Sequence, residues 1–416
     1  MTTPGPPPST PPRGAGPSRS MLGWILLLGA LATLPAFTVD TYLPALPDVA
    51  EEFGASDALA QLTLSGMLVG GAVGQFVIGP LSDRFGRRLP VLVGLTLHVV
   101  TSIACAFAPS IETLIVLRVL QGFFNAASQV VSIAVIRDQF TGAAAARILS
   151  RLMLVIGLAP LLAPSIGALI LADGGWRWVF GVLAILGVAL GLVVLFFMPE
   201  THPVAKRRTG GARSVLRGYA SLFKDRHFVA LAVLPGLGMA VLMSYVVGSP
   251  FVLQEGYDLT HAQFSVLFAV NGVGLVISAQ VNAALVRRVA PIRLLRAALV
   301  AQAGFAVVLL VVALTGAGGL VGLLVALWLV LSMQGMIPAN ASALALSRHG
   351  EMAGTAAAVI GAFQSGVAGV VSPLVGVLGG DATAMATVMV GAVALSLVVL
   401  ATATPAFRRG GWHTEI

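Results

Sequence analysis

Long apolar stretches separated by short polar turns run through the whole chain. Six lie at about residues 21–41, 58–78, 89–108, 111–135, 148–172 and 178–198, and six more lie near 227–248, 262–285, 292–314, 319–339, 353–378 and 382–403. Each is close to the roughly 20 residues with which an α-helix crosses the hydrocarbon core of a bilayer. The pattern predicts an all-α membrane protein with twelve transmembrane helices in two pseudo-symmetric six-helix bundles.

The same pattern divides the chain into five regions. They are a disordered cytoplasmic tail (1–20), an N-terminal six-helix bundle (21–198), a cytoplasmic linker (199–226), a C-terminal six-helix bundle (227–403) and a cytoplasmic tail (404–416). The first twenty residues contain seven prolines and no apolar run, a composition that does not support a packed core. They do not form a secretory signal peptide, because the apolar run that follows is too long and lacks a small-residue cleavage site.

Composition and charge support a membrane location. Hydrophobic residues make up 57% of the chain and charged residues 10%, against about 25% charged residues in soluble domains. The net charge of +8 does not indicate a nucleic-acid partner, because 22 of the 24 Lys and Arg residues fall in alternate loops and in the tails. Acidic residues gather in the other loops. This positive-inside pattern predicts that both termini are cytoplasmic, and the Arg-, Ala- and Gly-rich composition indicates a bacterial inner membrane.

Charged residues inside the predicted spans are the sharpest functional signal, since an ionisable group there is costly and commonly functional. Asp40 lies toward the outer end of the first helix, and Arg118 lies within the fourth. A nearby cation favours the ionised form of a carboxyl group, whereas burial favours the neutral form. We interpret Asp40 as a proton-coupling acid that alternates between an ion pair with Arg118 and a protonated, released form. The alternatives are a static ion pair and, if the helix ends at Thr41, a solvated helix end.

Polar residues of the fourth helix recur at helical spacing. Arg118, Gln121, Asn125, Gln129 and Ser132 project from one face, which we expect to line a water-filled cavity rather than to bond neighbouring helices. Methionine and tyrosine in the seventh helix suit a permissive apolar pocket. The predicted substrate-binding residues are Tyr42, Gln121, Asn125, Gln129, Met239, Met243, Tyr245 and Asn271.

Two short repeats relate the halves of the chain. Tyr42 to Pro47 is echoed by Tyr245 to Pro250, and Pro164 with Gly167 is echoed by Pro373 with Gly376. The two offsets agree with half the chain length. Together with the hydropathy layout they indicate an internal duplication, as in transporters whose substrate site lies between two repeated halves.

Several motifs resemble those of the major facilitator superfamily. The segment GPLSDRFGRR, Gly79 to Arg88, is similar to the signature of the loop between helices 2 and 3. Arg118, Gln121 and Gly122 resemble the intramembrane arginine motif. GLAPLLAPSIG, Gly157 to Gly167, resembles the antiporter motif of helix 5, although Ala159 and Pro160 stand where that motif has Gly-Pro. TVDTYLPALP, GWRWVF, MPET and SPFVLQE resemble the bicyclomycin and chloramphenicol resistance branch (Bcr/CflA) of the drug:proton antiporters.

The resemblance implies roles for these residues. A functional acid is expected at the position of Asp40, facing the cavity. The cluster around Asp83 and Arg87 is expected to latch the two halves on the cytoplasmic side when the cavity faces outward; simple topology determination by positive charge is the alternative. The predicted gating residues are Gly79, Asp83, Arg84, Gly86, Arg87, Gly157, Pro160, Pro164 and Gly167. Close helix packing alone is the alternative for the glycines and prolines of helix 5.

These observations predict a monomeric secondary active exporter and not an enzyme. It exchanges an antibiotic-like small molecule for protons by alternating access, and it needs no cofactor beyond the proton gradient. No Walker-type glycine-rich loop for ATP occurs, and the lone Cys105 excludes a disulfide framework and a cysteine-based metal site. A proton-coupled carrier for a metabolite such as a sugar is the first alternative, and a non-transporting membrane receptor is the second.

Overall fold

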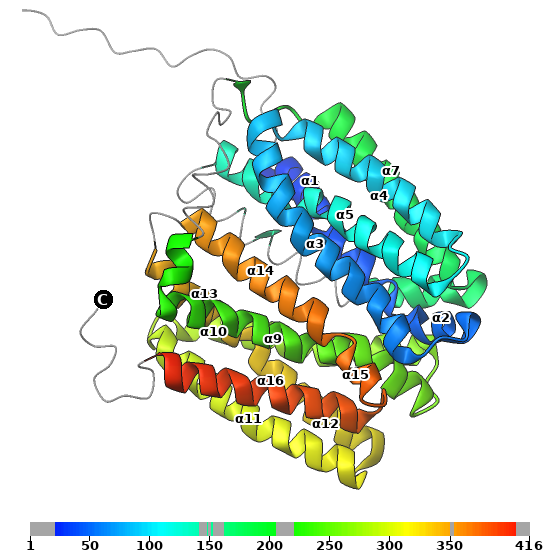
Figure 1. The fold of residues 1–416 in the computed structure, drawn as a ribbon, viewed down its shortest axis with the longest axis vertical. Coiled ribbons are helices and arrows are strands. Elements are labelled where there is room, and N and C mark those ends of the chain that lie inside the picture. The colour runs from blue at the N-terminus through cyan, green and yellow to red at the C-terminus, as the bar shows by residue number, and fades with distance from the viewer. Residues whose placement is uncertain are drawn as a thin grey trace, which may run out of the picture.

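The computed structural model describes residues 21–140, 148, 151–152, 162–204, 220–349 and 353–404, and this part of the chain forms two helical halves that lie side by side (Figure 1). The first half contains α1 (Met21–Asp40), η1 (Leu43–Ala45), α2 (Leu46–Phe53), α3 (Asp57–Phe85), α4 (Arg88–Ala106), α5 (Ile111–Gln139), the helix Leu162–Gly174 and α7 (Trp176–Phe197). The second half contains α9 (Arg226–Pro250), η3 (Phe251–Glu255), α10 (His261–Leu285), α11 (Pro291–Thr315), α12 (Gly319–Ser332), η4 (Met333–Gly335), α13 (Ile337–Ser347), α14 (Ala353–Val371), α15 (Leu374–Val377) and α16 (Ala382–Ala403).

Eleven helical segments of the described chain are long and apolar enough to cross a membrane. The predicted span 148–172 is described only in part, as the shorter apolar helix Leu162–Gly174. The predicted span 319–339 is broken by the turn η4 and continues to Ser347, and the predicted span 353–378 breaks before α15. Pro338 lies beside the first break and Pro373 beside the second. Proline lacks the backbone N–H that a continuous α-helix requires, so helices commonly break near it. Residues 220–224, expected in the linker, are helical.

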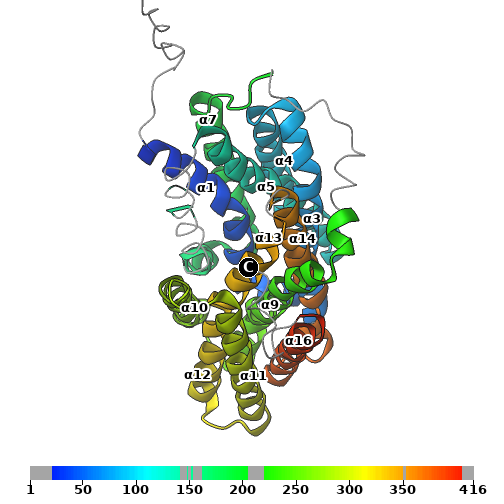
Figure 2. The ribbon, with the colours of Figure 1, turned by 90° about the vertical axis from the view of Figure 1, so that its left-hand side faces the viewer.

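The helices give the molecule two chemically different ends. The arginine-rich end includes Arg84, Arg88, Arg226, Arg288 and Arg348, and the acid-rich end includes Asp48, Glu52, Asp57, Glu255 and Asp381. Figure 2 shows α4 and α7 on one flank and α11 and α12 on the opposite flank, with α3, α5, α9 and α14 between them. The interface between the halves therefore runs through the middle of the molecule, where α3 packs on α14.

Glycine sets the tightest helix contact of the first half, between α3 and α5. A Cβ atom on Gly70 would lie 1.9 Å from the carbonyl oxygen of Val119, and one on Gly122 would lie 2.0 Å from that of Met67. Only glycine permits this approach, as expected for membrane helices that associate through small residues. The contact fixes the position of α5, which carries the polar residues predicted to be functional.

Polar contacts join the two halves at the acid-rich end. The Pro164 carbonyl of the first half accepts from Ser265 Oγ of α10 at 3.0 Å, and the backbone N–H of Gly376 donates to Gln61 Oε1 of α3 at 2.9 Å. Pro164 and Gly376 belong to the two copies of the predicted proline–glycine repeat. Each copy thus contacts the opposite half, which is the arrangement expected of duplicated bundles.

Candidate functional site

Arg118 lies fully buried in α5, at the centre of a polar and aromatic cluster. Its Nη1 atom donates to Gln121 Oε1 at 2.6 Å, and both terminal nitrogens lie 3.5 Å from the carbonyl oxygen of Thr38 in α1. The guanidinium carbon is 4.7 Å from the ring centre of Tyr42 and 5.5 Å from that of Phe180. Oxygen acceptors and aromatic faces therefore stabilise this cation without a carboxylate partner.

The rest of the polar face of α5 also bonds to neighbouring helices. The donor–acceptor pairs are Gln121 Nε2 to Ser102 Oγ (2.7 Å), Asn125 Nδ2 to Thr38 Oγ1 (3.0 Å) and Gln75 Nε2 to Gln129 Oε1 (3.4 Å). Gln121 and Asn125 are buried, and Gln129 is half-buried. The expectation that this face lines a water-filled cavity is wrong for Arg118, Gln121 and Asn125 in this structure. Their hydrogen bonds instead connect α5 to α1 and α4.

Asp40 is the last residue of α1, and only 6% of its surface is exposed. It is not the solvated helix end that the sequence left open, because the chain continues through η1 into α2 and covers it. The predicted ion pair between Asp40 and Arg118 is absent, and the carboxylate forms no hydrogen bond or ion pair with any other residue in the described chain. The structure thus shows the two charged groups separated.

The second half contributes an apolar and aromatic surface in place of charges. The ring of Tyr245 stacks on Phe268 with centroids 5.0 Å apart, and Met243 is buried beside Met239, which is half-buried. Asn271 is 1% exposed, and its side chain interacts with the hydroxyl group of Tyr245. The two residues add polar groups to this apolar surface.

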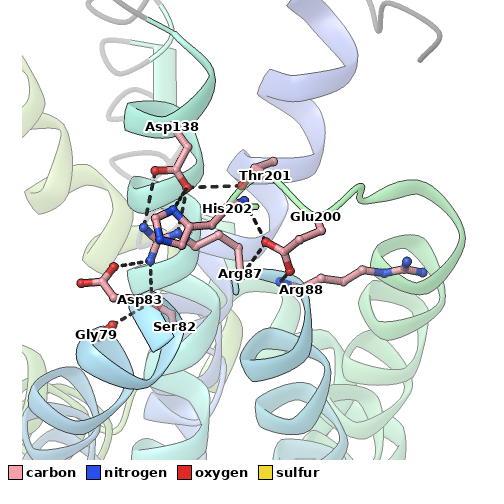
Figure 3. Close-up of polar contacts among 9 residues, drawn as sticks. All are labelled: Gly79, Ser82, Asp83, Arg87, Arg88, Asp138, Glu200, Thr201 and His202. Carbon is pink, nitrogen blue, oxygen red and sulfur yellow. Dashed lines mark hydrogen bonds and ion pairs between the residues drawn. The ribbon is translucent and has the colours of Figure 1, made fainter. Parts of the chain in front are cut away.

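A second cluster lies at the arginine-rich end, around Arg87 (Figure 3). Arg87 is 5% exposed; its Nη1 atom contacts Asp83 Oδ1 at 2.6 Å and Ser82 Oγ at 2.8 Å, and its Nε atom contacts Asp138 Oδ2 at 2.8 Å. Burial by itself lowers the pKa of Arg87, but the hydrogen bonds that Arg87 donates to the carboxylates of Asp138 and Asp83 raise this pKa above its ordinary value. Arg87 therefore carries a permanent charge that binds the end of α3 to the end of α5.

Glu200 completes this cluster from the segment after α7. Its carboxylate accepts from the backbone N–H of Arg87 at 2.8 Å and from that of Arg88 at 3.2 Å, and so caps the start of α4. Glu200 and Asp138 are functional residues that the sequence motifs do not single out. Asp138 follows Arg137 near the end of α5, and a carboxylate in this arginine-rich region is the signal that points to it.

The other predicted gating residues have varied environments. Gly86 has φ +92°, which favours glycine and permits the sharp turn between α3 and α4. A Cβ on Gly79 would meet nothing within 4 Å, so this glycine makes no close helix contact in this structure. Arg84 is exposed. A Cβ on Gly167 would lie 2.2 Å from the Thr41 carbonyl oxygen, which shows a close approach to the end of α1.

Gly157 and Pro160 lie outside the described residues, whereas Pro164 is buried and contacts α10. Across the described ranges, no group of three or more His, Cys, Asp or Glu side chains is arranged to hold a metal ion. The chemistry of the two clusters is therefore that of charged groups and hydrogen bonds.

The variant Asp138→Asn is expected to destabilise the protein by about 1–3 kcal/mol, because Arg87 loses a charge-assisted partner while remaining buried. The measurement is the thermal unfolding temperature of the purified protein in detergent. Arg84→Gln is the matched control, since Arg84 is exposed, and we expect no change for it. An unchanged unfolding temperature for Asp138→Asn would mean that the contact between Arg87 and Asp138 does not stabilise the protein. Topology determination would then remain as the role of the arginines in this loop.

Comparisons with known proteins agree with these features. A model of the Major Facilitator Superfamily matches residues 25–373. The uncharacterized MFS-type transporter YdgK of Bacillus subtilis is 38% identical over 260 residues, which are 62% of this chain and 65% of that protein, just under two thirds of its length. A bicyclomycin resistance protein homolog of Haemophilus influenzae is 32% identical over 284 residues, which are 68% of this chain and 71% of that protein.

Among solved structures, the nucleoside transporter NupG has a similar fold. Its TM-score is 0.74 at 15% sequence identity, and the superposition covers 93% of this chain and 100% of that one. At this identity the likeness concerns the fold alone.

Proposed function

The chain belongs to the major facilitator superfamily, whose members are membrane transporters and not enzymes, and we propose that it is a secondary active exporter that exchanges antibiotic-like compounds for protons. The likeness to a bicyclomycin resistance protein homolog supports this class of substrate. The observation that carries the proposal is Asp40, a carboxyl group that is 6% exposed and has no partner among the described residues. Such a group gains or loses a proton more readily than one fixed in an ion pair.

Proton coupling follows from the separation of Asp40 and Arg118. Arg118 is stabilised by Thr38, Gln121 and aromatic rings, so it does not require the charge of Asp40. Asp40 is then free to bind a proton in this arrangement and to release it in another, where Arg118 lies closer. An incoming proton supplies about 2.3 kcal/mol per 100 mV of membrane potential, to which a pH gradient adds.

Alternating access is the proposed motion. The positive-inside pattern supports an arrangement in a bacterial inner membrane with the arginine-rich end on the cytoplasmic side and the acid-rich end outside. Contacts such as Ser265 to Pro164 and Gly376 to Gln61 hold the halves together at the acid-rich end. This structure accordingly represents the form closed to the outside, in which a compound enters from the cytoplasm or the inner leaflet.

The residues of the second half suit a neutral or singly charged amphipathic compound. Tyr245, Phe268 and Met243 offer aromatic and adaptable apolar surface, and Asn271 offers an amide donor. A sugar carrier is expected to present more carboxylates and aromatic rings around its substrate, so a sugar is the less favoured substrate.

The test uses the full chain in liposomes that contain a pH-sensitive dye. Adding bicyclomycin or chloramphenicol to the outside of the liposomes is expected to move protons out of the lumen, toward the side of addition, in exchange for the compound that enters. Expression in an efflux-deficient host is expected to protect growth. A panel of sugars and amino acids serves as the comparison. Proton movement with metabolites but not with antibiotics would replace drug export by metabolite transport, and no movement with any compound would overturn proton coupling.

A further inference from the structure

His261 is placed across the interface between the two halves, at the acid-rich end. It is the first residue of α10, where Thr260 and Gln263 form a capping box that fixes the start of the helix. Its Nε2 atom lies 3.6 Å from Asp48 Oδ2 of α2 in the other half. The side chains of His261 and Asp48 are 33% and 38% exposed, so protons from the solvent reach both.

The hydrogen bonds around His261 decide which ring nitrogen carries its first proton. Gln254 Nε2 donates to the carbonyl oxygen of Pro44 at 3.2 Å, and because a carbonyl oxygen only accepts, this contact orients the amide. The Oε1 atom of Gln254 then faces His261 Nδ1 at 2.6 Å, and this pair requires the proton to be on Nδ1. In the neutral ring, Nε2 therefore presents a lone pair to the Asp48 carboxylate. A second proton on Nε2 changes this contact from repulsion to attraction.

Several acidic groups lie on the elements around this contact, and the cation Arg177 at the same end is paired with Glu52 of α2. Glu51 lies on α2 beside Asp48 and interacts with it, and Glu255 at the end of η3 interacts across the interface with Glu51 and with Asp57 at the start of α3. Asp258, in the loop before α10, and Asp173, at the end of the helix that contacts α10, are also acidic. Like charges that face one another from the two halves favour their separation, and a cation among them favours closure.

We propose that Nε2 of His261 is a proton-binding site distinct from Asp40, and that a proton bound there holds the two halves together at the acid-rich end through Asp48. The neutral ring, with a lone pair facing a carboxylate, weakens that closure. For an exposed pair of this kind the closed population changes by about fivefold at most from the pair itself.

Protonation of His261 returns the transporter to the form that is open to the cytoplasm, and this inference rests on the proposed function. When the acid-rich end opens to an acidic exterior, the proton that binds His261 draws the halves together on that side. Closure there returns the substrate site to the cytoplasm. His261 thus binds a proton at the outer surface, and this proton is distinct from the one that Asp40 binds.

The experiment measures the distance between the halves without any substrate. Spin labels on Phe107→Cys and Ala317→Cys, two exposed positions at the acid-rich end of different halves, report closure by pulsed electron resonance in a Cys105→Ser background. We expect the ratio of the short-distance to the long-distance population to be higher at pH 5.5 than at pH 8, by about fivefold at most.

The variants separate His261 from the surrounding carboxylates. His261→Gln and Asp48→Asn are each expected to lose the difference between pH 5.5 and pH 8, and His261→Arg is expected to stay closed at pH 8 because its charge is permanent. The control is His349→Gln, which removes a contact of 3.1 Å with Asp225 at the opposite end and is expected to leave the distances unchanged.

The outcomes decide between the two proton sites. A wild-type distance distribution that is the same at pH 5.5 and pH 8, or a His261→Gln protein that responds to pH as the wild type does, would overturn the proposal. Asp40→Asn is expected to keep the pH-dependent closure while it loses transport. A variant that loses transport but keeps the pH-dependent closure therefore tests the proposed function. A variant that keeps transport but loses the pH-dependent closure tests the role of His261.

Discussion

Asp40→Asn is expected to reduce proton-driven drug export to the level of empty vesicles while the protein still reaches the membrane. Asparagine keeps the size and hydrogen-bonding shape of the side chain but cannot exchange a proton at physiological pH. Because the carboxyl group of Asp40 has no partner among the described residues, the substitution breaks no ion pair and folding is expected to persist. The measurement is dye-detected proton release and antibiotic uptake in inverted vesicles at matched protein levels.

Glu112→Gln is the matched control for that experiment. Glu112 is an exposed carboxylate in the first turn of α5, on the same helix as Arg118 but outside the polar cluster. We expect this variant to transport at the wild-type rate. Full transport by Asp40→Asn would remove Asp40 from the mechanism, and the proton would then have to be carried elsewhere in the protein.

Gly122→Ala is expected to have the largest effect on stability. The added methyl group would lie 2.0 Å from the Met67 carbonyl oxygen, and this is a backbone atom that cannot move without shifting α3. Overpacking of this kind costs about 1–3 kcal/mol and at times more. The measurement is the thermal unfolding temperature in detergent, together with transport, which we expect to fall because α5 carries Arg118.

Gly191→Ala is the control for this substitution. Gly191 lies within α7, and a Cβ built on it meets nothing within 4 Å. Alanine favours a helix over glycine by about 1 kcal/mol, so this variant is expected to be neutral or more stable. If Gly122→Ala matches Gly191→Ala in unfolding temperature, the close α3–α5 contact does not determine the stability of the first half.

The two groups that we propose bind protons, Asp40 and His261, have different surroundings and different expected roles. Asp40 is buried at the end of α1, where a charge is costly, so its protonation state is expected to bear on the transport step. His261 is partly exposed at the acid-rich end, and its contact with Asp48 bears on which end of the molecule is closed. In a proton-driven exporter, a proton-binding group on the outer side responds to the pH of the side from which the protons enter.

The sequence alone determined the class, the family and the general layout of this protein. Apolar stretches of the length of a bilayer span, alternating with arginine-rich and acidic loops, predict twelve helices and two chemically distinct ends, because the membrane restricts the backbone to helices of about that length. The motif from Gly79 to Arg88 also predicted a charged cluster that includes Asp83 and Arg87, and these two residues, four positions apart, contact each other. The contacts of this cluster in the described chain join segments of the first half, so the expected latch between the two halves stays a prediction.

Only the tertiary structure decided which distant side chains meet. The partner of Arg87 on α5 is Asp138, 51 positions away, and the partners of Arg118 are Gln121 and the Thr38 carbonyl instead of the expected Asp40. Such contacts depend on the rotation of each helix about its axis and on the approach that glycines such as Gly122 permit. Hydropathy carries no information on either quantity, and the contact between His261 and Asp48 depends further on how the two halves are tilted.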